Sequence, residues 1–223
     1  MAKQFLFWER NACSRSCLDQ RSVGFKPKPY DPDEKKRDDP RVADPVLKEG
    51  ALLTNVFNRL ARSCFYEAGK NFDGYLPLGA PTPEVVERAH ETLRAYDETM
   101  HRVELHAVMS LMDDFIRFAN KHWTEGIRQA ELADDQAARR QVLVDSFYLL
   151  WVATLLMHPV VPFGTEKICD YLNFEFDEFF SWNYDFEGMD ELCSAGEITE
   201  GRHRVRDLPP RFDFFERHPS QAK

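Results

Sequence analysis

The sequence has no apolar run of the roughly 18 residues that a membrane-spanning helix requires. Its longest candidate, residues 147–157, is better explained as a buried helix. The 10 glycines are scattered singly, so the sequence offers no glycine-rich loop for phosphate. The five cysteines are an odd and widely spread set, which is typical of reduced thiols and not of a disulfide framework. These absences predict a cytoplasmic protein without a membrane segment.

Signatures of catalysis and metal binding are also missing. None of the patterns His-Glu-x-x-His, Gly-x-Ser-x-Gly and Cys-x-x-Cys occurs. His101 and His106 are five residues apart, so on one helix they would not share a face. Cys13 and Cys17 have no second cysteine or histidine pair at ligand spacing nearby. We therefore expect a non-catalytic chain with no metal ion and no cofactor.

The charge is acidic overall but unevenly distributed. The formal net charge is −9, which argues against binding to nucleic acid through charge alone. Residues 1–30 contain six lysines and arginines against two acidic residues, whereas residues 174–200 are rich in acidic and aromatic side chains. A locally basic surface therefore remains compatible with weak contacts to phosphate.

Hydrophobic periodicity and helix-start signals predict an all-α protein, a helical bundle of about five helices over residues 44–172. Residues 1–43 are expected to form an irregular arm and linker, and residues 173–223 an irregular C-terminal extension. The helices are expected over residues 44–68, 82–99, 103–122, 134–158 and 165–172. The starts are assigned to Asp44-Pro45, Thr82-Pro83, Asp134-Asp135 and Thr165-Glu166, and Gly69 is expected just past the end of the first helix.

Asn55 and Arg59 lie four residues apart in the first predicted helix, so they share one polar face beside its apolar stripe. That stripe consists of Leu53, Val56, Phe57, Leu60, Cys64 and Phe65. An amide and a guanidinium one turn apart suit planar edges that both accept and donate hydrogen bonds, and nucleobases are the commonest such edges. The alternative is an ordinary solvated helix face.

Three motifs taken together resemble the anticodon-binding domain of the class I methionyl-tRNA synthetases. They are Leu-Thr-Asn-Val-Phe-Asn-Arg over residues 53–59 with Asn-Phe-Asp-Gly-Tyr-Leu-Pro over 71–77, Phe-Ala-Asn-Lys over 118–121, and the segment from Leu155 to Ile168. The resemblance covers residues 44–172. It implies a helical bundle that grips an anticodon stem-loop, with a methionine-type tRNA as the partner.

The resemblance also implies that Asn55 and Arg59 match the anticodon-contacting asparagine and arginine of the family. Splayed bases are read through stacking and edge hydrogen bonds, which these side chains supply. Where the family has a proline–tryptophan pair whose ring stacks on a base, this sequence has Arg128 and Gln129. Trp123 lies earlier on the same segment. Either it stacks on a base from a shifted position, or it belongs to the core.

A second departure is that the ATP-binding signatures of these synthetases do not occur in this sequence. Three functions therefore stay open at this point. The chain is a non-catalytic tRNA-binding module, or a degenerate synthetase relative that docks a protein such as a synthetase catalytic subunit. The third alternative is the C-terminal part of a split or truncated methionine–tRNA ligase.

Overall fold

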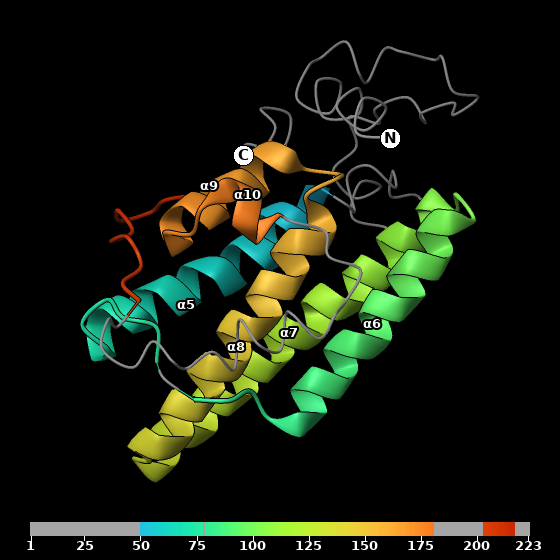
Figure 1. Cartoon of the computed structure of the whole chain (residues 1–223). Coiled ribbons are helices and arrows are strands. Elements are labelled where there is room, and N and C mark those ends of the chain that lie inside the picture. Colours follow the sequence, from blue (N-terminus) through green and yellow to red (C-terminus); the bar gives the residue numbers. More distant parts are fainter. Residues whose placement is uncertain (1–49, 78, 181–202, 217–223) are drawn as a thin grey trace, which may run out of the picture.

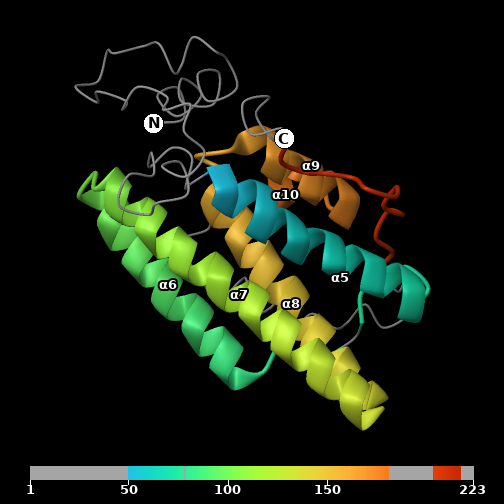
Figure 2. The ribbon, with the colours of Figure 1, turned by 180° about the vertical axis from the view of Figure 1, so that it is seen from behind.

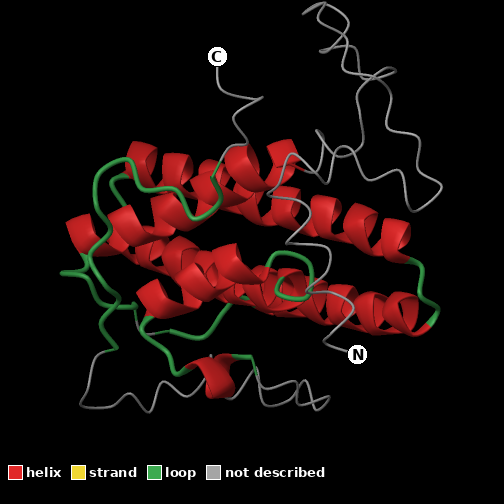
Figure 3. Cartoon of the chain, turned by 90° about the horizontal axis from the view of Figure 1, so that it is seen from above, coloured by secondary structure: helices red, strands yellow, loops and turns green. Residues whose placement is uncertain are grey.

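The computed structural model describes residues 50–77, 79–180 and 203–216, which form an all-α bundle (Figure 1). The predicted fold class is confirmed. Within these ranges there is no strand (Figure 3), and a single isolated bridge pairs Tyr75 with Arg204. The predicted arm over residues 1–43 and the predicted helix start at Asp44 lie outside the described residues.

The first described helix is continuous but changes type along its length. After α-helical Gly50 and Ala51, the segment η1 (Leu52–Phe57) is π-helical, and it continues directly into the α-helix α5 (Asn58–Asn71). The predicted helix is confirmed, but its predicted end was wrong, because the helix passes through Gly69. A glycine only weakens a helix, and the chain turns where Asp73 and Gly74 take φ values of 53° and 76°.

Three long helices form the body of the bundle and lie alongside one another in Figures 1 and 2. They are α6 (Pro83–His101), α7 (Leu105–Ala133) and α8 (Gln136–Met157). α7 continues well past residue 122, where the sequence predicted its end. Gly126 does not break it but allows α8 to approach closely, because a Cβ there would lie 2.7 Å from Cγ2 of Val142.

The central helix of the core is α8, in which every residue from 143 to 157 is buried. By length and composition α8 could cross a membrane, but 83% of its most apolar 18-residue window is buried inside the bundle. The prediction of a buried helix over residues 147–157 is thus confirmed. The predicted capped start of α8 is also confirmed, because Asp135 Oδ1 accepts the N–H groups of Ala137 and Ala138 at 2.9 and 3.0 Å.

Two shorter helices follow, α9 (Pro162–Leu172) and α10 (Phe176–Phe179). α9 begins at Pro162, so the predicted cap at Thr165 was wrong. Thr165 is buried inside the helix, and its hydroxyl donates to the carbonyl groups of Val161 and Pro162 at 3.0 and 2.8 Å. A proline in the first turn lacks only an N–H that would stay unbonded there anyway, which explains the earlier start.

Residues 203–216, called the C-terminal strap below, run back alongside α5 and α9 (Figure 2). The ring of Phe215 stacks on Phe57 with 5.2 Å between centroids, and Phe214 lies 5.6 Å from Phe65. A Cβ at Gly164 would collide with the ring of Phe215, so only glycine fits at that position of α9. The described part of the extension therefore wraps the bundle and completes its core.

Candidate functional site

Asn55 and Arg59 both have exposed side chains on the first helix. Asn55 belongs to η1 and Arg59 to the first turn of α5. Phe57 and Asn58, which lie between them in sequence, are 0% and 1% exposed. Arg59 forms no hydrogen bond or ion pair with any other residue in the described part of the chain. Among the residues that the structure describes, none occupies its guanidinium donors.

The two candidate residues lie on either side of the junction between the π-helix and the α-helix. The backbone N–H of Asn58 donates to the carbonyl oxygen of Leu53, five residues earlier, whereas an α-helix would use the carbonyl of Thr54. This wider turn also explains why Leu52 and Phe57, five residues apart, are both buried. Single π turns inside α-helices are frequent at functional sites. A search for a 3.6-residue period does not detect them.

Asn58 is a residue whose role sequence reasoning missed. Its Oδ1 accepts the N–H groups of Phe214 and Phe215 at 3.0 and 3.1 Å, and its Nδ2 donates to the carbonyl of Phe215 at 2.8 Å. Buried polar side chains are almost always hydrogen-bonded, and asparagine is a weak helix former. An asparagine next to the apolar stripe of a helix is the signal that would have indicated a buried contact.

Further contacts attach the C-terminal strap to the same helix. Arg62 forms an ion pair with Asp213 at 2.8 Å, and the hydroxyl of Tyr66 donates to the carbonyl of Pro209 at 2.9 Å. Asn58, Arg62 and Tyr66 follow one another at intervals of four residues, so they lie in a row along α5. The strap therefore covers one flank of the helix that carries Asn55 and Arg59.

Trp123 lies on α7 and is 7% exposed, within the hydrophobic core. This position agrees with the core alternative, because a ring enclosed by apolar neighbours has no open face on which a base could stack. We therefore leave Trp123 out of the candidate site. Arg128 and Gln129 lie on the same helix and are exposed. Here α7 runs on without interruption where the family has its proline–tryptophan pair.

The structure also contains a buried carboxylate, Asp145 on α8, which is 2% exposed. It accepts the N–H and the hydroxyl of Thr82 at 2.8 and 3.2 Å and an amide N–H of Gln141 at 3.0 Å. His122 Nε2 lies 3.2 Å from Oδ2, but at an angle that is poor for a hydrogen bond. This arrangement joins the start of α6 to α8.

The protonation state of Asp145 follows from these contacts. Burial raises the pKa of its carboxyl group, but His122 and the donors from Thr82 and Gln141 outweigh burial, so the pKa lies below its usual value. The carboxylate stays ionised and its oxygens are occupied by internal donors. Asp145 therefore serves as a structural clamp and not as an acid or base.

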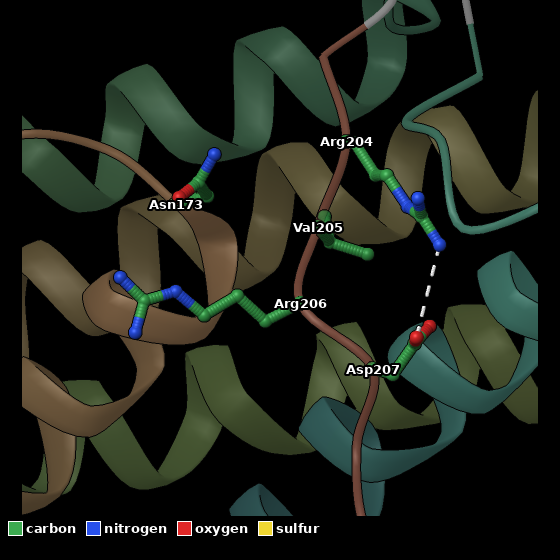
Figure 4. A pocket seen from close by; sticks show the side chains of 5 residues that line it. All are labelled: Asn173, Arg204, Val205, Arg206 and Asp207. Carbon is green, nitrogen blue, oxygen red and sulfur yellow. Dashed lines mark ion pairs between the residues drawn. The ribbon is translucent and has the colours of Figure 1, made fainter.

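An open depression of about 380 Å³ lies where the strap passes the end of α9. Figure 4 shows the side chains that line it, which include Arg204, Arg206 and Asp207. Arg204 pairs with Asp207 at 3.7 Å, and Arg206 pairs with Asp170 at 2.8 Å. Because both guanidinium groups already have carboxylate partners, this depression is a weaker candidate for an anion than the surface around Arg59.

His158 predicts a pH dependence of stability. Its ring stacks on Phe180 with 3.8 Å between centroids, and its burial lowers the pKa from the usual 6.5. The unfolded chain then binds more protons than the folded chain at mildly acidic pH, so stability is complete above about pH 6.5 and falls as the pH drops towards the folded pKa.

Urea midpoints of the wild type and His158→Gln, measured from pH 7.5 to 5.0, should show a shallower decline in the variant. A matched His106→Gln variant, at an exposed histidine that has no ion pair among the described residues, should decline as steeply as the wild type. Equal slopes for all three proteins would contradict the assignment.

Comparison with known proteins connects this geometry to one kind of enzyme. The chain is 24% identical over 128 residues to a methionine–tRNA ligase of Bacillus cereus, and 22% identical over 128 residues to one of Bacillus mycoides. Each match covers 57% of this chain and 24% of the relative. No protein-family model matches the chain. The chain thus spans about a quarter of the length of the curated relatives that it matches.

Solved structures give the same result for the fold. The free form of Mycobacterium tuberculosis methionyl-tRNA synthetase superimposes with a TM-score of 0.57 at 21% identity, covering 77% of this chain and 33% of that chain. The same enzyme in complex with methionyl-adenylate gives 0.55 at 20% identity with the same coverage. The resemblance stated from the motifs is confirmed: the helical bundle is related to methionyl-tRNA synthetases.

Proposed function

We propose that this synthetase-related bundle is a tRNA-binding module that contacts the anticodon loop of a methionine-type tRNA through Asn55 and Arg59. The observation that carries the proposal is the exposure of both side chains on a helix whose opposite face is fully packed. Arg59, which has no partner among the described residues, supplies guanidinium donors, and Asn55 supplies an amide; these are the groups with which splayed bases are read. The module performs no chemistry of its own.

The charge distribution on α5 supports this proposal despite the net charge of −9. Glu67, the acidic residue of α5, is drawn inward, where it pairs with Arg139 at 3.0 Å. Arg59 and Lys70 remain exposed and Tyr66 exposes part of its ring on the same side, whereas Arg62 is paired with Asp213. Positive charge interleaved with an aromatic ring suits a nucleic-acid backbone with unstacked bases.

The direct test is a binding measurement with initiator and elongator methionine tRNAs and with one of them carrying a different anticodon. Because phosphate contacts weaken as salt rises, all three should be measured at the same stated ionic strength. We expect tighter binding of the two methionine tRNAs. Equal affinity for the three RNAs would refute recognition of the anticodon.

Arg59→Ala should weaken binding of a methionine tRNA by about 1–3 kcal/mol, because the variant loses the guanidinium donors to a base. The fold should be unaffected, since the side chain is exposed and has no partner among the described residues. Arg94→Ala removes the same charge from an exposed position on α6 and serves as the control. Equal losses in the two variants would show that only overall charge matters.

A second candidate function is that the bundle acts together with an ATP-binding synthetase half, because the relatives carry the matched region as one part of a longer chain. In this alternative the bundle docks onto a synthetase catalytic subunit and supplies its tRNA-binding part. The chain would then raise aminoacylation when it is added to an ATP-binding half that lacks its own bundle. If aminoacylation does not rise, or if the two proteins do not co-purify in the absence of RNA, this function is excluded.

A further inference from the structure

We infer that Asn58 is a positioning residue, which sets the relative orientation of Asn55 and Arg59 by stabilising the π turn between them and tying it to the C-terminal strap. This inference rests on the proposed function, because it concerns how the same two side chains are presented to a nucleotide. It adds a residue that does not itself face the RNA.

The Asn58 side chain takes part in the hydrogen bonding of the helix backbone. Because the N–H of Asn58 bonds to Leu53, the carbonyl of Thr54 lacks its usual α-helical donor. The side-chain Nδ2 of Asn58 lies 3.2 Å from that carbonyl oxygen and donates to it. The side chain thus replaces the hydrogen bond that the π turn removes. A backbone carbonyl that is shielded from water and has no donor would lower the stability of the fold.

The Asn58 side chain also connects the helix to the C-terminal strap. The same side chain holds the backbone of Phe214 and Phe215 through the three hydrogen bonds described above, and its Nδ2 lies 3.3 Å from Asp213 Oδ1. These partners lie 155 to 157 residues further along the chain. With every acceptor and donor engaged, the amide has one orientation, and the π turn is fixed with it.

The π turn also affects how side chains are arranged on the outer surface of the helix. In a regular α-helix, residues four apart are offset by about 40° around the axis. A π turn takes more residues, so each residue rotates less and the offset between Asn55 and Arg59 becomes smaller. The two side chains therefore come closer to a single line along the helix. Relaxation of the π turn to an α turn would rotate one of them away from a shared base.

The experiment compares the affinities of the full chain for two short RNA hairpins, one with the methionine anticodon in its loop and one with a changed anticodon. Asn58→Asp keeps the shape of the side chain and removes its donors, but it places a carboxylate beside Asp213. Combining Asn58→Asp with Asp213→Asn removes the repulsion between the two carboxylates, while the carbonyl of Thr54 still lacks a side-chain donor. Tyr66→Phe is the control, since it removes one hydrogen bond between α5 and the strap far from the π turn.

We expect the double variant to lose about tenfold in the ratio of the two affinities, and the control to stay within about twofold of the wild type. Hydrogen exchange of the backbone N–H at position 58 should be faster than in the wild type only in the variants that change this residue. A double variant that keeps the wild-type ratio would overturn the inference while the proposed function stands. A wild-type chain that binds both hairpins equally would instead refute the proposed function.

Discussion

Asp145→Ala is expected to lower the free energy of unfolding by about 3–5 kcal/mol, the range seen when one partner of a buried charged network is removed. The carboxylate is the shared acceptor for the N–H and hydroxyl of Thr82 and for Gln141, and it lies next to His122. Without it the N–H of Thr82 loses its acceptor, and Gln141 keeps only the carbonyl of Ala80. The start of α6 also loses its attachment to α8. Urea unfolding at neutral pH measures the change.

Asp145→Asn separates charge from shape in the same experiment. The asparagine retains one carbonyl oxygen for the N–H of Thr82, so we expect a smaller loss than with alanine. If asparagine and alanine destabilise equally, the negative charge and not the number of acceptors holds the clamp together. A change below about 0.5 kcal/mol in the alanine variant, as at an ordinary surface position, would contradict the structural role of this carboxylate.

Leu60→Ala is expected to lower the free energy of unfolding by about 2–5 kcal/mol. Leu60 is 0% exposed and belongs to the apolar stripe of α5, which packs against α7 and α8. Truncating the side chain removes buried methyl groups and leaves a cavity that a close-packed core cannot fill. Because Arg59 next to it is exposed, these adjacent positions separate stability from binding.

Leu132→Ala is the matched control, because Leu132 is 82% exposed on α7. The same chemical change there should alter the free energy of unfolding by less than about 0.5 kcal/mol. RNA affinity, measured well below the melting temperature, should be retained by both leucine variants. If the two variants had similar stability, the packing of α5 against the bundle would be incorrect.

Local signals predicted most of the helices. Thr82-Pro83 and Asp135 mark the starts of α6 and α8 as expected, and the apolar run over residues 147–157 is buried. Two differences involve residues that serve a distant contact. α7 continues past residue 122, where Gly126 allows it to pack closely on α8, and the hydroxyl of Thr82 bonds to Asp145 instead of capping α6.

The candidate site was predicted in part. The spacing of Asn55 and Arg59 indicated a shared polar face, and both side chains are exposed. The spacing did not indicate the π turn between them, because a π turn inserts a residue into the very period on which the prediction depends. The structure also places Trp123 in the core, a choice between two alternatives that the sequence left open.

The amino-acid sequence by itself determined the all-α class, the order of the helices and the outward face of the first of them. Those properties depend on side chains within one or two turns of each other, and their spacing is visible in the chain. Only the tertiary structure decided that Asn58 joins the first helix to the C-terminal strap and that Asp145 joins α6 to α8. Their partners lie 155 to 157 and 63 residues away, and such contacts form only when packing brings the segments together.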